Sequence, residues 1–265
     1  MDKLYKWISK HKIIAFILYN SICWMSFLLL SAVIEIHLVW WFVFGLFILL
    51  ISTMFVSSAD RYTLNKAIKV LNEQCDPNPF LETVEQQLSR VKSKSYRQLL
   101  LINKAAALRE LGRFDEAISI LSSMNIDQYS TTGPLVKILY YNNLTDILII
   151  KGEFSQAKTW HSKMIQMLHD VKAKEKYKKL LNETSISNQA ELLVADNNLA
   201  EAENMLNGLP ESISNRQRIS KSLLYARILI KQNKPNEAKQ CLQFVVDHGN
   251  RLYDAVQARA ILNSL

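Results

Sequence analysis

Apolar residues are concentrated near the amino end of the chain, where charge almost disappears. From Ile13 to Ser57 the only formal charge is that of Glu35, which separates two apolar runs of 22 residues, Ile13–Ile34 and Ile36–Ser57. A helix needs about 20 apolar residues to cross a hydrocarbon core of roughly 30 Å. Each run is long enough to span a bilayer, so the pattern predicts a transmembrane hairpin over residues 13–57 with its turn at Glu35.

Basic residues in the short flanks predict the orientation of this hairpin. Residues 1–12 hold four lysines and one aspartate, whereas the turn holds neither lysine nor arginine. Positively charged flanks stay on the cytoplasmic side. We therefore expect a basic cytoplasmic tail over residues 1–12 and a two-span protein of the cell membrane, with both termini in the cytoplasm. One competing interpretation is a signal peptide followed by a buried helix, and the second apolar run disfavours it. The others are a single long bent helix and a re-entrant loop.

Beyond residue 60, the chain has a helical period of apolar residues and repeats a short segment. The hexamer Gly112–Ala117 recurs as Gly152–Ala157, and degenerate copies are Asn197–Ala202 and Asn233–Ala238. Each copy follows one amphipathic run and opens the next, and its Gly or Asn supplies the left-handed residue that ends a helix. The pattern predicts about four helix pairs.

A second regularity supports the same register. Twelve residues before the alanine that closes each hexamer stands another small side chain, and a leucine follows it three residues later. The small residues are Ala105, Thr145, Ala190 and Ala226, and the leucines are Leu108, Leu148, Leu193 and Leu229. Small side chains at fixed spacing let paired helices approach closely. Four coincidences in one register indicate a structural repeat.

These features resemble the tetratricopeptide repeat (TPR) family, with a small residue in helix A, Gly-x-Phe/Tyr-x-x-Ala at the turn and a small residue in helix B. The resemblance covers roughly residues 96–246. The sequence departs from the family in its spacing, because the closing alanines are 40, 45 and 36 residues apart, against a family period of about 34. Pro235 also replaces the turn aromatic of the fourth copy. The resemblance implies an all-α protein in which a transmembrane hairpin precedes a TPR-like α-solenoid.

Helical segments on both sides of the repeats are expected to cap the solenoid, because its end helices need cover. A degenerate capping pair is expected over residues 60–92, as Asp60–Leu71 and Phe80–Val91. Residues 93–265 then hold the repeats and a C-terminal capping helix, Leu252–Leu265. The extra length between the second and third copies, Leu168–Asn182, predicts an overlong helix B in the second repeat.

The residues carry no sign of catalysis. The chain has no Gly-rich phosphate loop, zinc-ligand pair, nucleophile elbow or paired-cysteine motif. We therefore expect a protein that is not an enzyme and that needs neither a metal nor a cofactor.

The basic balance of the chain leaves two interpretations open. Residues 60–265 hold 28 Lys and Arg against 22 Asp and Glu. Nucleic-acid binding would favour a basic stripe interleaved with aromatic residues; the densest basic run lacks these, so we expect no nucleic-acid partner. That run is either a solvated helix face or a contact for anionic headgroups. Its lipid-facing candidates are Lys172, Lys174, Lys178 and Lys179.

In TPR proteins, residues of helix A line a concave groove that accepts a peptide or a partner helix. Carried over in register, the resemblance implies a partner-binding groove of Asn103, Arg109, Asn142, Asn143, Asp146, Asn188, Glu191, Arg227 and Lys231. Three of these asparagines stand two residues before the small residue of their repeat, where an amide serves either a bound peptide backbone or repeat packing. The family's carboxylate clamp is missing, because Ile102, Ala106 and Thr184 occupy its positions.

The expected function is that of a membrane-anchored TPR-like scaffold or adaptor, which binds a protein or peptide partner at the cytoplasmic membrane face. Two alternatives remain. The protein is either a subunit of a membrane or cell-envelope complex, recognised through its spans, or a binder of anionic lipid through its basic face.

Overall fold

Helices make up all the regular structure in the part of the chain that the computed structural model describes, which is residues 2–31, 38–126, 133–170, 175–210 and 214–265. The all-α prediction is therefore confirmed for these residues. The chain divides into two units, Met1–Ile68 and Lys69–Leu265.

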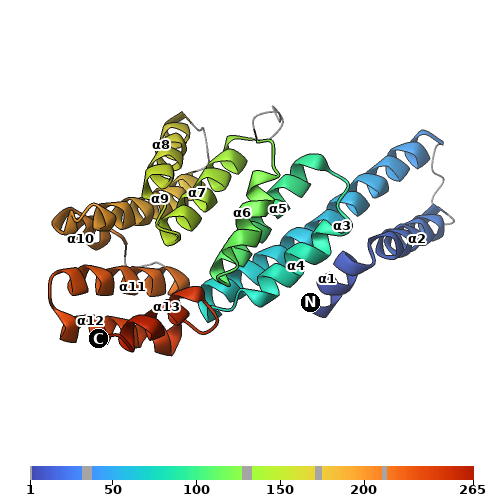
Figure 1. The fold of residues 1–265 in the computed structure, drawn as a ribbon. Helices are drawn as coiled ribbons and strands as arrows, with labels where there is room; N and C mark the ends of the chain where they lie inside the picture. Colours follow the sequence, from blue (N-terminus) through green and yellow to red (C-terminus); the bar gives the residue numbers. More distant parts are fainter. Residues whose placement is uncertain (1, 32–37, 127–132, 171–174, 211–213) are drawn as a thin grey trace. The chain divides into compact units, whose positions relative to one another are not determined.

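The first unit contains two helices that are long and apolar enough to cross a membrane. After a short helix α1 (Asp2–Lys10), these are α2 (Lys12–Ser31) and the amino-terminal part of α3 (Leu38–Gln74) (Figure 1). Their mean hydropathy is 2.1 and 2.2, and most of their apolar side chains lie on the surface; Leu29 is 70% exposed. Such surfaces suit lipid rather than a soluble core. The predicted turn at Glu35 lies outside the described residues.

Aromatic side chains join α2 to α3. The rings of Phe27 and Phe44 stack with centroids 3.9 Å apart, and the ring of Trp24 lies 6.3 Å from that of Trp41. Gly45 makes room for this contact, because a Cβ atom there would lie 3.3 Å from the Trp24 ring. Helices α2 and α3 are therefore packed together by aromatic rings, and one of these rings, that of Trp24, lies against Gly45.

Two segments near the amino end have other helix bounds than the sequence suggests. Residues 2–10, within the expected basic tail, form helix α1, because Tyr5, Ile8 and Ser9 lie on one helical face and contact α3. The expected capping helix Asp60–Leu71 is the continuation of α3, since neither Gly nor Pro separates it from the apolar run. The second helix of the expected pair is α4 (Asn78–Leu88), with proline in its first turn.

The second unit contains four helix pairs followed by a last helix (Figure 1). In each pair, the two helices pack against one another, and α4 packs on the first helix of the series. The pairs are α5 (Lys94–Glu110) with α6 (Phe114–Ser122), α7 (Pro134–Ile150) with α8 (Phe154–Asp170), α9 (Glu175–Ala195) with α10 (Leu199–Asn207), and α11 (Asn215–Lys231) with α12 (Pro235–His248); α13 (Tyr253–Leu262) follows.

The turn within each pair is set by one left-handed residue, as the sequence predicts. The φ angles are 75° at Gly112, 77° at Gly152, 62° at Asn197 and 58° at Asn233. The next amide of each turn donates to the carbonyl of the repeat leucine over 2.8–2.9 Å, as in Arg113 N to Leu108 O. This 6→1 bond is that of a Schellman motif, which satisfies carbonyls left free at a helix end.

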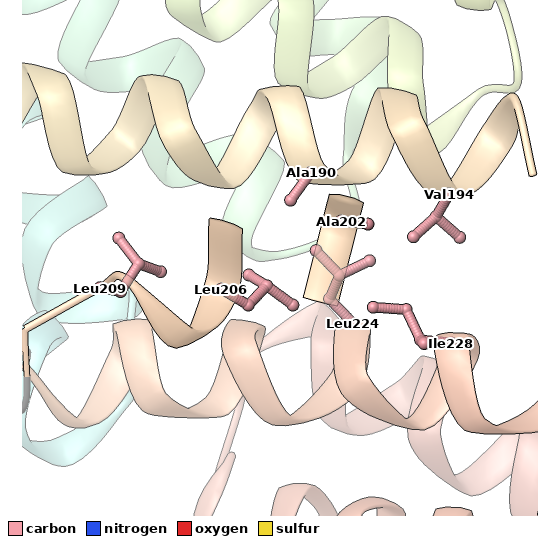
Figure 2. Close-up of a cluster of buried hydrophobic side chains, with 7 residues drawn as sticks. All are labelled: Ala190, Val194, Ala202, Leu206, Leu209, Leu224 and Ile228. Carbon is pink, nitrogen blue, oxygen red and sulfur yellow. The ribbon is translucent and has the colours of Figure 1, made fainter. Parts of the chain in front are cut away.

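The small residues of the repeat lie where the paired helices meet. All eight are fully buried, with 0% exposure: Ala105, Thr145, Ala190, Ala226, Ala117, Ala157, Ala202 and Ala238. Figure 2 shows the third pair, where Ala190 of α9 and Ala202 of α10 lie beside Leu206 and where Leu224 and Ile228 of α11 complete the cluster. The burial that the register predicts for these small residues is therefore observed.

Two repeat copies have unusual sequences: the second is followed by extra residues, and the fourth contains Pro235. Helix α8 is described as far as Asp170 and α9 begins at Glu175, so α9 contains part of the extra residues that were expected to lengthen helix B of the second repeat. The fourth pair is regular, because Pro235 stands in the first turn of α12, where a helix needs no amide donor.

The carboxyl-terminal helices return to the start of the second unit. Three carbonyls around the end of α3 accept hydrogen bonds from residues far along the chain: Glu73 O from Asn215 Nδ2 (2.8 Å), Gln74 O from Asn250 Nδ2 (2.8 Å) and Cys75 O from Arg251 N (3.2 Å). The rings of Tyr253 and Phe114 meet edge to face at 4.8 Å. Helix α13 therefore closes the array onto its first pair, a contact that the sequence does not predict.

This closure can be tested with two glycines in matching turns. Gly112→Ala and Gly152→Ala both place a side chain in the left-handed region, which costs about 1–2 kcal/mol. A Cβ atom at Gly112 would also lie 2.5 Å from the Tyr253 ring, whereas nothing lies within 4 Å of one at Gly152. We expect a further loss of about 1–3 kcal/mol at Gly112.

The measurement is thermal unfolding of the full chain in detergent, followed by circular dichroism. Each kcal/mol lowers the Tm of a unit of this size by about 2–4 °C. Equal Tm values for the two variants would contradict the packing of Tyr253 on the turn that contains Gly112.

Candidate functional site

The first helices of the pairs bring charged side chains together inside the second unit. Asp146 of α7, Glu191 of α9 and Arg227 of α11 each follow the small residue of their repeat. Arg109 of α5 reaches the first of them, with its Nη2 atom 3.6 Å from Asp146 Oδ2 and 2.8 Å from Glu110 Oε1. The repeated position thus places charge where these helices face one another.

A second arginine connects the two ends of the array. Arg216 of α11 lies with its Nη1 atom 2.6 Å from Glu110 Oε1, and its Nε atom donates to Asn72 Oδ1 of α3 over 3.1 Å. Glu110 is only 4% exposed and pairs with both arginines. This carboxylate therefore links α11 to α5, while Arg216 extends the link to α3.

The remaining contacts reach α13. Arg227 places Nη1 3.4 Å from Glu191 Oε2 and donates from Nη2 to Gln257 Oε1 over 2.8 Å. Ser220 of α11 donates to Asp254 Oδ2 over 2.6 Å. We use the term charge network for Arg109, Glu110, Asp146, Glu191, Arg216, Arg227 and Asp254, which come from α5, α7, α9, α11 and α13.

The four carboxyl groups of the network differ in their pKa shifts. Burial would raise the pKa of Glu110, but the charges of Arg109 and Arg216 outweigh burial and lower it. At Asp146 and Glu191, burial raises the pKa and outweighs the opposing charges of Arg109 and Arg227 respectively. Burial, followed by the charge of Glu110, raises the pKa of Asp254. Only one carboxyl of the four is stabilised as an anion.

Two adjoining cavities border this network and share Ile149, Ile150 and Glu191. The polar cavity, of about 80 Å³, is lined mainly by charged, amide and hydroxyl side chains from α5, α7, α9 and α11, including Arg109, Asp146 and Arg216. The apolar cavity, of about 340 Å³, has Phe154, Val194, Ala195 and Leu224 in its wall and Arg227 and Lys231 at α11. Because Glu191 lines both cavities, a ligand bound at Glu191 would be in contact with both of them.

Most of the expected groove residues meet at these cavities. The polar cavity is lined by Arg109, Asp146, Asn188 and Glu191, and the apolar cavity by Glu191, Arg227 and Lys231.

The asparagines have different surroundings. Asn188 donates to Asn142 Oδ1 over 3.0 Å, and both are buried. Asn143 is also buried and donates to Ile102 O of the preceding pair over 3.1 Å, so its amide serves repeat packing. Asn103 is half-buried and lines neither cavity. The asparagines therefore do not form one ladder for a bound backbone.

The lysines proposed to face lipid are only partly placed. Lys172 and Lys174 lie outside the described residues, Lys178 lies in α9, and Lys179 of the same helix is exposed.

Sequence analysis missed Glu110, Arg216 and Asp254. All three are charged residues in amphipathic helices, and the TPR register does not mark their positions as inward-facing. A signal for Glu110 was present, because it interrupts the apolar residues before the turn at Gly112. Arg216 and Asp254 face inward only because the array closes, and local periodicity carries no information on that contact.

Comparison with known proteins adds no relative: no protein-family model, no curated protein and no solved structure matches the chain.

The raised pKa of Asp254 predicts a pH-dependent stability difference. A carboxyl whose folded-state pKa is raised contributes stability that is present below its unfolded pKa, about 4, and is lost as the pH rises through the folded value. The amide introduced by Asp254→Asn cannot ionise and keeps an oxygen for Ser220. We therefore expect the variant to exceed the natural protein in Tm at pH 8, with a smaller excess near pH 4.

The matched control is Asp247→Asn, which changes an exposed carboxylate of α12. Thermal unfolding at both pH values is the measurement. A Tm difference that is the same at both pH values would contradict the buried, hard-to-ionise state of Asp254.

Proposed function

We propose that the protein is a membrane-anchored TPR-like scaffold or adaptor that binds a short segment of a protein partner at the cytoplasmic face of the cell membrane. In this proposal, α2 and the apolar part of α3 span the bilayer, and the second unit carries the binding site. The mechanism is positioning: the anchor confines a bound partner to the membrane and raises its local concentration there.

The observation that carries the proposal is the apolar cavity with its basic edge. The volume of about 340 Å³ lies within the range of ligand sites, and its aliphatic wall suits an apolar anchor side chain of a partner. Lys231 is exposed, and no ion pair joins it to another residue in the described ranges. A cation of this kind beside an apolar cavity favours a partner segment with an acidic group next to its apolar side chain.

The closed array favours a short segment over a long helix. Helices α11 and α13 contact the start of the unit, and the polar cavity next to the site holds only about 80 Å³. An anchor side chain and its neighbouring acidic group need no more than the apolar cavity and its edge. This differs from the extended groove that the family resemblance implies.

Site-specific photo-crosslinking in membranes of the native host tests the proposal. A crosslinking side chain replaces Ala195, which lines the apolar cavity, or Ala200, which is exposed on α10 outside it. We expect one defined adduct from Ala195 and none from Ala200. Lys231→Glu should lower its yield about five- to tenfold, since tenfold corresponds to about 1.4 kcal/mol, whereas Lys239→Glu, an equal charge change on α12, should not.

An adduct that forms equally from both positions, or that persists in Lys231→Glu, would contradict the site. Exchange of residues 13–57 for an unrelated hairpin separates the rival in which the spans select the partner. The adaptor proposal predicts that the adduct survives this exchange, and the rival predicts its loss.

A further inference from the structure

Helix α1 is held against α3 by one of its faces. Ile8 is 2% exposed and packs with Ala15 and Ala59, and Ser9 Oγ donates to Asp60 Oδ1 over 2.8 Å. Lys12, one turn further on, forms an ion pair with Asp60. The carboxyl-terminal half of α1 is therefore anchored by a buried polar contact as well as by apolar packing.

The amino-terminal half of α1 is held on the same face. The ring of Tyr5 stacks on that of Tyr62 with centroids 4.3 Å apart. Asp2 pairs with Lys66 and accepts a hydrogen bond from Tyr62. Contacts at both ends fix the rotation of α1 about its own axis, so the side chains on its outer face point in a defined direction.

That outer face carries two strips of different chemistry. At about 100° per residue, Lys3, Lys6 and Lys10 fall in one strip, and Leu4 and Trp7 in the next. Leu4 is 54% exposed and Trp7 is 40% exposed. The three lysines are exposed, and no ion pair joins any of them to another residue that the structure describes.

We propose that the outer face of α1 is a binding surface for anionic lipid headgroups. Leu4 and Trp7 lie at the boundary of the acyl chains, and the lysines reach the negatively charged headgroups. Such a division between apolar and basic strips is typical of helices that lie in a membrane interface. Helix α2 begins two residues after α1 ends, so a membrane that contains α2 places α1 at its surface.

The choice of lipid follows from charge. Within the described ranges, the three lysines have no acidic partner in the protein, and an anionic leaflet supplies one. The inference rests on the proposed membrane anchor but not on the proposed binding site. It also concerns other residues than the lipid contact expected at Lys172–Lys179. The lysines of α1 stand on a helix that contacts with α3 hold in place on its opposite face.

Spin-label accessibility in lipid nanodiscs tests the surface. The full chain, with Cys23→Ala, Cys75→Ala and Cys241→Ala, carries a single label at Leu4→Cys, at Leu29→Cys in α2 or at Glu82→Cys, an exposed position of α4. The nanodiscs contain phosphatidylcholine alone or mixed with phosphatidylglycerol. The readout is the collision rate of each label with oxygen, which is enriched in lipid, and with a water-soluble nickel chelate.

We expect the Leu4 label to collide with the nickel chelate about threefold less often than the Glu82 label in anionic nanodiscs, with oxygen collisions raised. The difference should shrink in phosphatidylcholine alone and in the variant Lys3→Gln, Lys6→Gln, Lys10→Gln. Lys234→Gln with Lys239→Gln, two exposed lysines of the second unit, should leave it unchanged.

The outcomes separate the inference from the anchor. If the Leu29 label is in lipid while the Leu4 label behaves like Glu82 in both membranes, the α1 surface is refuted and the anchor stands. If the Leu29 label is also in water, the anchor fails. Protection of the Leu4 label from both reagents would mean that protein covers it, which refutes the lipid surface. Protection that does not depend on anionic lipid or on the three lysines would refute headgroup binding.

Discussion

The ion pair between Arg216 and the buried carboxylate of Glu110 is the interaction that ties the two ends of the second unit together. Glu110 is almost inaccessible to water, and it faces two guanidinium groups from different helices. Loss of Arg216 would leave the Glu110 carboxylate with one ionic partner instead of two. Since Arg216 also reaches Asn72, this contact ties α3, α5 and α11 to one another.

The charge network also explains why the two cavities lie where they do. Packing of the pairs needs only small residues at the helix crossings, and these are fully buried. The next position along helices α7, α9 and α11 then faces inward, where Asp146, Glu191 and Arg227 meet. Their size and charge prevent close packing of an apolar core, and two cavities remain beside Glu191.

Sequence analysis predicted the parts of this structure that local physics decides. A left-handed residue at Gly112 or Asn197 and a small residue such as Ala190 have the same consequence in any helix pair, so the pairs follow from short-range patterns. The closure does not, because the bond from Asn215 to Glu73 O joins residues 142 positions apart. The closure depends on how far each helix pair is rotated relative to the pair before it, added up over all four pairs. Arg109, Asp146 and Glu191 were predicted because they follow the repeat register, and Arg216 was missed because it faces inward only through the closure.

A double-mutant cycle on Arg216 and Glu110 tests the central claim, that this ion pair holds the array closed. Arg216→Met, Glu110→Gln and the double variant are compared by urea unfolding of the full chain in detergent. Our account predicts that each single change costs about 1–3 kcal/mol, because Glu110 keeps Arg109 as a partner when Arg216 is changed, and that the double variant is about 1–2 kcal/mol more stable than additivity requires. Additive losses would contradict it, because independent side chains cannot hold the two ends of the array together.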